Sequence, residues 1–209
     1  MASRFSRCGG RKCRNSCALA TTLLVALVGL YGCSSPPDKA GAAAHLAKGK
    51  DFLEQDLVEE ALKELKEAVK CDPTDAEAHT ELSKALDDNN QGNQAMLEME
   101  IAVKLAPDDA DKADRYVAML EDFGKYEKAI ETEKKLLAMR PNDAMLKRQA
   151  AWLFEQVGDH KTALSLIRDA VKADPNEEHG WYTYGKMLND MGKSTEAVQV
   201  LKQGLKKCP

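Results

Sequence analysis

The sequence predicts an all-α protein built from five repeated helical pairs, and three observations carry this prediction. Five of the seven prolines are evenly spaced 34 residues apart: Pro73, Pro107, Pro141, Pro175 and Pro209. An alanine precedes each of them by twelve residues: Ala61, Ala95, Ala129, Ala163 and Ala197. The chain is 31% charged, only 5% aromatic and has a mean hydropathy of -0.47, which is typical of amphipathic helices rather than of strands.

The N-terminal segment has the layout of a secretory signal. Residues 1–32 contain no acidic residue, and their five positive charges precede an apolar run over residues 18–30. That run would extend roughly 20 Å as a helix, which is shorter than a hydrocarbon core of about 30 Å. The alternative is an uncleaved anchor, because residues 15–37 carry no charge and would just span with Tyr31 at the interface.

The sequence Leu30-Tyr31-Gly32-Cys33 resembles the lipobox of bacterial lipoproteins, although Tyr31 departs from the small residue usual there. The resemblance implies that residues 1–32 are a cleaved signal peptide and that Cys33 carries diacylglycerol and acyl chains such as palmitate. Several chains anchor a protein stably, whereas one alone is marginal. Ser34 follows the cysteine where Asp often favours the inner membrane, so the resemblance implies the periplasmic face of the outer membrane.

Residues 33–41 form the lipidated cysteine and a linker, in which eight residues reach at most about 28 Å. The domain that follows must therefore lie close to its membrane. Removal of residues 1–32 takes away five positive charges and leaves 34 acidic residues. An acidic domain without a basic patch excludes nucleic acid as an expected partner.

The remaining chain resembles the tetratricopeptide repeat, with large apolar residues at positions 4, 11 and 24 of each unit, small ones at 8, 20 and 27, and Pro at 32. Five units are expected: 42–75, 76–109, 110–143, 144–177 and 178–209. The resemblance implies a right-handed superhelix of helix-turn-helix units with a concave groove. Each unit contacts only its neighbours, because a single helical pair cannot bury its apolar face.

The turns and irregularities of the repeat carry further predictions. We expect positive φ angles between the two helices of each unit: Asp56, Asn90, Gly124, Gly158 and Gly192. We also expect the residue after each proline to cap the next helix: Thr74, Asp108, Asn142 and Asn176. The third unit diverges most, with Val117 at position 8 and Glu133 at position 24.

No motif for catalysis is present. The sequence has no Gly-rich phosphate loop, no zinc-spaced Cys or His set and no nucleophile with recognisable partners. His45 and His79 hold the same core position in adjacent units, so we interpret them as structural. We expect no enzyme activity, no cofactor, no metal and no small-molecule substrate.

The repeats that this chain resembles bind their ligands mainly through positions 2, 5, 9, 12 and 13 of each first helix. Carried over, these positions predict a groove lined mostly by acidic residues: Lys50, Lys84, Asp87, Asp88, Asp111, Asp114, Glu121, Asp122, Arg148, Trp152, Glu155, Tyr182 and Lys186. We expect a partner protein with a basic segment and an apolar residue beside Trp152. The alternative is that the acidic face is only solvated.

Two cysteines remain in the expected mature domain, and they end the first and last units. Cys71 and Cys208 are then too far apart to pair within one chain. An exposed Cys208 would link two copies as a homodimer, or would stay reduced or in a mixed disulfide. Without a polar helix over the last unit, Val198, Leu201 and Leu205 are expected to be exposed and to meet a partner or a second copy.

These observations predict a non-catalytic, membrane-anchored adaptor of the bacterial cell envelope, for example in secretin, pilus or outer-membrane assembly. One alternative is an uncleaved single-pass membrane protein acting as a co-chaperone or sorting subunit. The co-chaperone form is disfavoured, since Leu46, Lys50 and Glu81 do not form the carboxylate clamp of such proteins. A regulator of a peptidoglycan-active enzyme is a third possibility.

Overall fold

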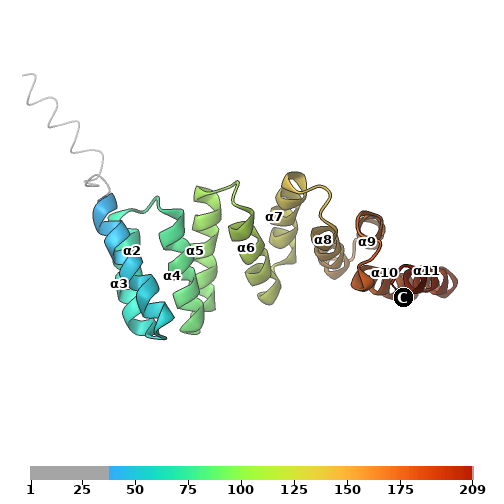
Figure 1. The fold of residues 1–209 in the computed structure, drawn as a ribbon, viewed down its shortest axis with the longest axis horizontal. Helices are drawn as coiled ribbons and strands as arrows, with labels where there is room; N and C mark the ends of the chain where they lie inside the picture. Colours follow the sequence, from blue (N-terminus) through green and yellow to red (C-terminus); the bar gives the residue numbers. More distant parts are fainter. Residues whose placement is uncertain (1–37, 209) are drawn as a thin grey trace, which may run out of the picture. The chain divides into compact units, whose positions relative to one another are not determined.

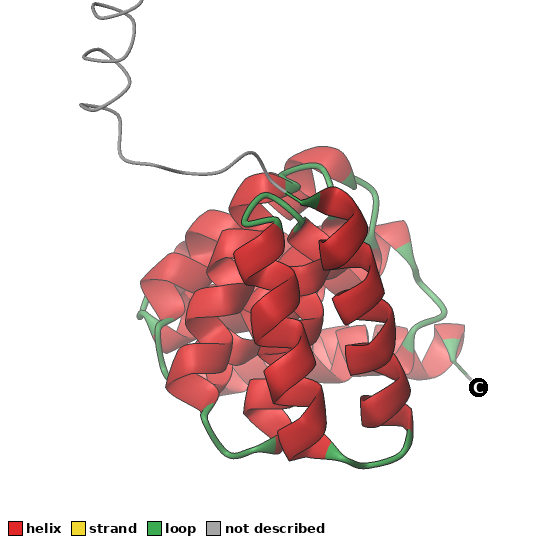
Figure 2. Cartoon of the chain, turned by 90° about the vertical axis from the view of Figure 1, so that its left-hand side faces the viewer, coloured by secondary structure: helices red, strands yellow, loops and turns green. Residues whose placement is uncertain are grey.

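The structure is a computed structural model that describes residues 38–208. Residues 39–209 group as a compact unit of their own, the repeat array. The apolar run, Cys33 and the expected cleavage point lie outside the described residues. Within the described part every regular element is an α-helix (Figure 2), and none of these helices is long and apolar enough to cross a membrane.

The array contains ten helices in the described residues, two for each of the five units (Figure 1). In chain order they are α2 (Lys39–Glu54), α3 (Val58–Cys71), α4 (Ala76–Asp88), α5 (Gly92–Leu105), α6 (Ala110–Asp122), α7 (Tyr126–Met139), α8 (Ala144–Gln156), α9 (His160–Ala173), α10 (Glu178–Asp190) and α11 (Ser194–Lys207). The even-numbered helix is the first of each unit and the odd-numbered helix the second.

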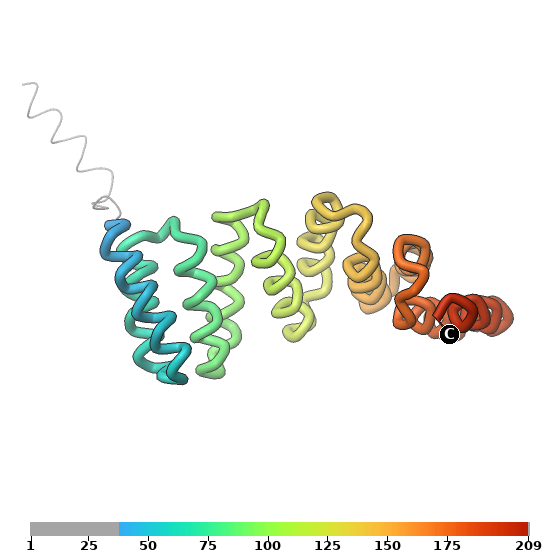
Figure 3. The backbone as a smooth tube through the Cα atoms, in the orientation of Figure 1, coloured from blue at the N-terminus to red at the C-terminus, as the bar shows by residue number. Residues whose placement is uncertain are grey.

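Each helix packs on the helices before and after it, and α2 also packs on α4. The helix axes turn progressively along the array, so that α2 is seen from the side and α11 nearly end-on in Figure 3. The buried apolar residues form three successive clusters along the helices, rather than one central core. The predicted all-α superhelix of five helical pairs is confirmed.

The turn within each unit also follows the prediction. Asp56 and Asn90 have φ angles of 59° and 57°, and the three glycines at the same position have φ angles of 64° to 81°. This left-handed conformation ends each first helix and lets the chain reverse into the second. Asp and Asn are among the few non-glycine residues that adopt it at low cost.

The predicted helix caps were wrong by one residue. Asp75, Asp109 and Asp143 hold the N-cap position, and their side chains accept hydrogen bonds from backbone N–H groups of the next helix. The proline and the residue after it instead form the middle of a turn, in which the N–H of Asp75 donates to the carbonyl of Asp72 at 3.2 Å. Proline favours the second position of such a turn because its φ angle is already fixed.

The first helix begins at Lys39, three residues before the expected start of the array at residue 42. Residues 39–41 are therefore helical and not part of an extended linker. Lys and Ala both have high helix propensity, and Gly41 alone is too weak a breaker to stop a helix that is packed on α3 and α4.

His45 and His79 make structural contacts, as predicted from their repeated position. The Nδ1 atom of each ring lies 2.7 Å from a glutamate Oε2 atom nineteen residues later, in Glu64 and Glu98. The Nε2 atom of His79 also lies 3.1 Å from the carbonyl oxygen of Pro73, just as Trp181 Nε1 donates to Pro175 at 2.9 Å. A histidine can thus replace the tryptophan of the last unit because both rings bond the preceding turn.

Candidate functional site: the groove face

The first helices of the five units form one side of the array, which we call the groove face. Two surface hollows lie on it. The first hollow, of about 410 Å³, lies between α2 and α4 and is lined by Lys50, Leu53, Glu54, Glu81, Lys84 and Asp88. The second hollow, of about 200 Å³, lies across α6, α8 and α10 and is lined by Glu121, Arg148, Gln149, Trp152 and Thr183.

A network of ion pairs joins the first three units across this face. Lys50 of α2 donates to Glu77 of α4 at 2.7 Å, and Lys112 of α6 lies 3.5 Å from the same carboxylate. The hydrogen bond from Lys50 lowers the pKa of Glu77 more than partial burial raises it. Lys84 similarly donates to Glu81 at 2.6 Å. The ammonium group of Lys50 is therefore already paired with Glu77 and does not stand free to bind the carboxylate of a ligand.

The pairing makes the groove face less acidic than a count of its residues predicted. Asp114 accepts a hydrogen bond from Arg140 at 2.7 Å, so its charge is balanced. Among the described residues no ion pair joins the remaining predicted acids of units two and three to a cation: Asp87, Asp88, Asp111, Glu121 and Asp122. These five carboxylates, and not all the predicted ones, are available to a charged ligand.

Trp152 of α8 forms the apolar wall of the second hollow. Its ring meets Tyr126 edge to face, with centroids 5.8 Å apart and an interplanar angle of 85°. Such a pair fixes the orientation of the indole, and 38% of Trp152 remains exposed. The Nε atom of Arg148 lies 3.5 Å from Glu177 and makes no hydrogen bond. The hollow thus combines a rigid aromatic surface with an incompletely satisfied guanidinium group.

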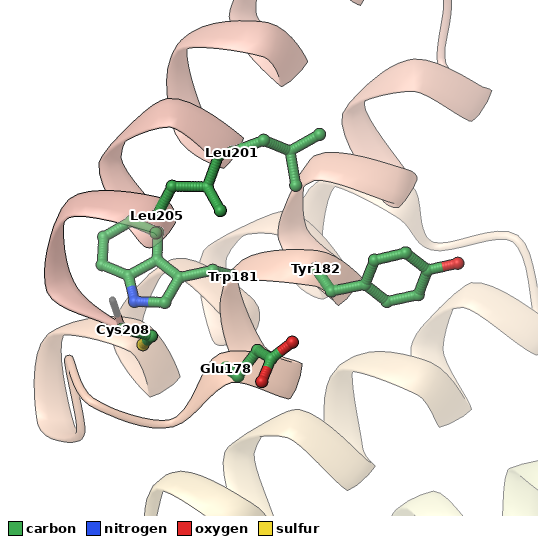
Figure 4. Close-up of a pocket in the computed structure, with 7 residues that line it drawn as sticks. Glu178, Trp181, Tyr182, Leu201, Leu205 and Cys208 are labelled. Carbon is green, nitrogen blue, oxygen red and sulfur yellow. The ribbon is translucent and has the colours of Figure 1, made fainter.

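The structure separates several residues that the sequence placed in one groove. Tyr182 lines a different hollow between α10 and α11, together with Cys208 (Figure 4), whereas Trp152 lines the second hollow. Glu155 lies at a small cavity near the turn that precedes α9. Lys186 is exposed, but neither groove hollow includes it. Trp152 and Tyr182, both predicted to line the groove, therefore line two different hollows.

Position 6 of the first helix was missed by the positions carried over from the repeat. Glu81, Gln149 and Thr183 all occupy it, and all three line the groove hollows. The available signal was their spacing, since position 6 lies three residues before position 9, where Lys84 and Trp152 had been predicted. Residues three apart share one face of a helix.

Glu133 is an unusual ionisable residue, because it is buried behind this face. It lies on α7 with only 2% of its surface exposed, and its Oε1 atom has no hydrogen-bond partner. Burial and the negative charges of Asp114 and Glu121 together raise its pKa to about 8, against the opposing effect of Arg140. Burial and the neighbouring Asp122 also raise the pKa of Glu121. The third unit thus holds a protonated acid at a position that is apolar in the others.

Comparison with known proteins agrees with this architecture. The sequence profile of the tetratricopeptide repeat matches residues 82–208, and a second profile of the same repeat matches residues 46–110. The chain belongs to the tetratricopeptide repeat (TPR) family. No curated protein matches the sequence.

Solved TPR structures have the same fold at low sequence identity. A crystal structure of MamA protein superimposes with a TM-score of 0.70 at 18% identity, covering 80% of this chain and 91% of the other. MamA from Desulfovibrio magneticus RS-1 has a TM-score of 0.67 at 20% identity, covering 80% and 94%. YrrB, described as a TPR protein with an unusual peptide-binding site, has a TM-score of 0.66 at 16% identity, covering 78% and 84%.

Proposed function

We propose that this TPR chain is a non-catalytic adaptor of the bacterial cell envelope that binds a segment of a partner protein along its groove face. The observation that carries the proposal is the second hollow, which is lined by Trp152 together with Glu121, an acid of the third unit that forms no ion pair with another described residue. Protein binding is the general role of TPR proteins, and YrrB, which has the same fold, has a peptide-binding site.

The chemistry of the face specifies the kind of segment. A large apolar side chain of the partner would lie on the exposed half of Trp152, since aromatic anchors dominate such interfaces. Basic side chains beside it would meet Glu121 and Asp122, and one further along would meet Asp88. Complementary charges of this kind determine orientation and association rate more than affinity.

Photocrosslinking in native membranes tests this proposal. A photoreactive residue in place of Gln149 lies in the second hollow, whereas the same residue in place of Glu131 lies on an exposed part of the second helix α7. We expect a defined crosslinked product from position 149 only. Equal products from both positions, or none from position 149, would contradict binding at the groove face.

Charge reversal then tests the role of the acids. The pair Asp88→Lys and Asp122→Lys removes two attractions and adds two repulsions, and we expect it to lower crosslinking from position 149 about tenfold at low salt. The matched control, Glu59→Lys with Glu131→Lys, makes the same change in charge on exposed second helices. Unchanged crosslinking in the first pair would mean that the acidic face is only solvated.

We also propose that Cys33 carries the lipid anchor and that the array works at the periplasmic face of the outer membrane. The support is the charged-then-apolar N-terminus, the lipobox-like sequence before Cys33, and Ser34 after it. The intact mass of the membrane-extracted protein tests this: residues 33–209 plus diacylglycerol and acyl chains are expected. The mass of the full, unacylated chain would instead favour an uncleaved anchor.

A further inference from the structure

The carboxyl group of Glu133 stands where the repeat otherwise places an apolar side chain. The other four units have an apolar residue at this position: Leu65, Met99, Ile167 and Leu201. Glu133 is 2% exposed, and its Oε1 atom has no hydrogen-bond partner within the described residues. A buried polar atom without a partner is costly and rare in native structures. Groove binding as proposed above makes no use of this group.

Four charged groups act on Glu133, from both helices that pack on α7 and from the end of α7 itself. They are two acids of α6, the residue that follows α7 and the N-cap of α8: Asp114, Glu121, Arg140 and Asp143. Of these four, only Arg140 is a cation. A buried carboxylate without a cationic partner is strongly disfavoured. Arg140 is therefore the partner available to Glu133 when that residue ionises.

Arg140 is held at the groove face by two of its three nitrogen atoms. Its Nη2 atom donates to Oδ2 of Asp114 at 2.7 Å, and its Nη1 atom lies 3.7 Å from Oδ2 of Asp143. The third nitrogen, Nε, is buried and has no hydrogen-bond partner among the described residues. A guanidinium group can donate through all three nitrogens. The third unit thus buries an unused N–H donor of Arg140 and an unused carboxyl oxygen of Glu133.

We propose that Glu133 and Arg140 form a proton-controlled switch that sets the negative charge of the groove face. With Glu133 protonated, Arg140 stays on Asp114 and balances its charge, as in the structure. When Glu133 loses its proton, the buried carboxylate draws the Nε–H of Arg140 inward, and the charge of Asp114 is no longer balanced. The inference rests on the proposed function, because the added negative charge acts on a basic segment bound along the groove face.

The released charge lies beside the proposed binding site. Asp114 and Glu121 are seven residues apart on α6, so they share one face of that helix. Glu121 lines the second hollow, and the side chain of Asp114 is 40% exposed. A basic segment lying along α6 would therefore meet both acids. The pKa of Glu133, about 8, places the change near neutral to mildly alkaline pH. By linkage, binding of a basic segment should promote loss of the proton.

Nuclear magnetic resonance of residues 39–209 tests the switch itself, since this part is a compact unit with its own buried clusters. In a titration from about pH 6 to about pH 9, the Nε signal of Arg140 should shift with the same midpoint as the carboxyl carbon of Glu133. Glu133→Gln should abolish this shift. Arg148 is the internal control, because its Nε atom is also buried without a hydrogen-bond partner in the described part of the chain, and it should not shift.

Photocrosslinking from position 149 of the full chain in native membranes tests the effect on binding. The yield should be about fivefold higher at about pH 9 than at about pH 6, as expected for one more attraction between partly exposed charges. Glu133→Gln and Glu133→Leu should both lower this gain, and the second restores the residue of units one and five. A smaller gain that remains belongs to other acids such as Glu121, whose pKa is raised by burial.

Two sets of results separate the switch from groove binding. An Arg140 signal that stays fixed, or that moves equally in Glu133→Gln, would overturn the switch. A crosslinking gain of equal size in the unaltered chain and in both variants, or no gain at all, would do the same, while the crosslinked product itself would still support groove binding. Absence of any product from position 149 at either pH would contradict the proposed function, and the role of the switch with it.

Discussion

The first and last units contain the same glycine–leucine contact in different surroundings. A methyl group on Gly49 would lie 2.5 Å from Leu65 Cγ, and one on Gly185 would lie 2.5 Å from Leu201 Cγ. The helices of the two units thus approach equally closely. Leu65 is nevertheless fully buried, whereas Leu201 is 38% exposed. The difference comes from the next unit, which covers Leu65, whereas no helix among the described residues covers Leu201.

The comparison separates two contributions to stability that the repeat sequence does not distinguish. Close approach within a unit depends on its own small residues, while burial of the second helix depends on the unit that follows. Within the described residues, the fifth unit should therefore be the least stable part of the array, because the outer side of its second helix is exposed. Substitutions at equivalent positions of the two units can measure this.

The largest effect is expected from truncating the two leucines. Leu65→Ala should destabilise the array by about 3–5 kcal/mol, because it leaves a cavity among fully buried neighbours. Leu201→Ala should cost about 1–2 kcal/mol, because its side chain is already partly hydrated. Denaturant unfolding of the two variants measures both costs. Equal costs would show that the following unit does not determine burial at this position.

Glu133 extends the comparison to the third unit. It holds the same position as Leu65 and Leu201, and it is buried like Leu65 although it is an acid. Its pKa of about 8 in the folded chain lies above the ordinary value of 4.5, so the folded state holds a proton that the unfolded state releases. Stability is thus fully present below pH 4.5 and falls as the pH rises to about 8. The loss amounts to about 4 kcal/mol.

Glu133→Gln isolates this contribution, since it keeps the shape of the protonated acid but cannot ionise. The raised pKa of His79, in which bonds to Glu98 and Pro73 outweigh the opposing effect of burial, adds a pH dependence of the same sign. Subtracting the pH dependence of stability of Glu133→Gln from that of the unaltered chain removes the contribution of His79. Unfolding curves with the same pH dependence for both chains would mean that Glu133 is ionised and hydrated in the folded state.

The smallest effect is expected from adding a methyl group to the glycines. Gly49→Ala forces a contact on Leu65, which cannot move, and should cost about 1–3 kcal/mol. Gly185→Ala forces the same contact on Leu201, which can turn toward solvent, and should cost less than about 1 kcal/mol. Thermal unfolding of the two variants compares them directly. A larger loss of stability for Gly185→Ala than for Gly49→Ala would contradict the conclusion that Leu201 has more room to move than Leu65.

The fold was predictable because the same pattern of proline, small and apolar residues recurs in all five units. Positive φ angles at Asp56 and Asn90 followed from the position of the glycines in the later units. The cap residues did not follow, since Pro73 and Thr74 form a turn and Asp75 holds the cap. Thr74 and Asp75 are both residue types that cap helices. Only the hydrogen-bonded turn shows which of the two holds the cap position.

The groove face was predictable in position but not in charge. Trp152 and Arg148 line the second hollow together, but Tyr182 lines a separate hollow between α10 and α11. The pairing of Asp114 with Arg140 could not be read from the sequence, because it joins a residue of α6 to the residue that follows α7, 26 positions later. Side-chain pairing between helices depends on the turn of the array, which the repeat pattern leaves open.

Hydrogen exchange of the second helices tests the central claim most directly, namely that a neighbour over the outer face stabilises each second helix. The amides of α11 should exchange faster than those of α9, which α10 covers, and faster than those of α3, which α4 covers. Protection of α11 that equals that of α9 and α3 would contradict the claim.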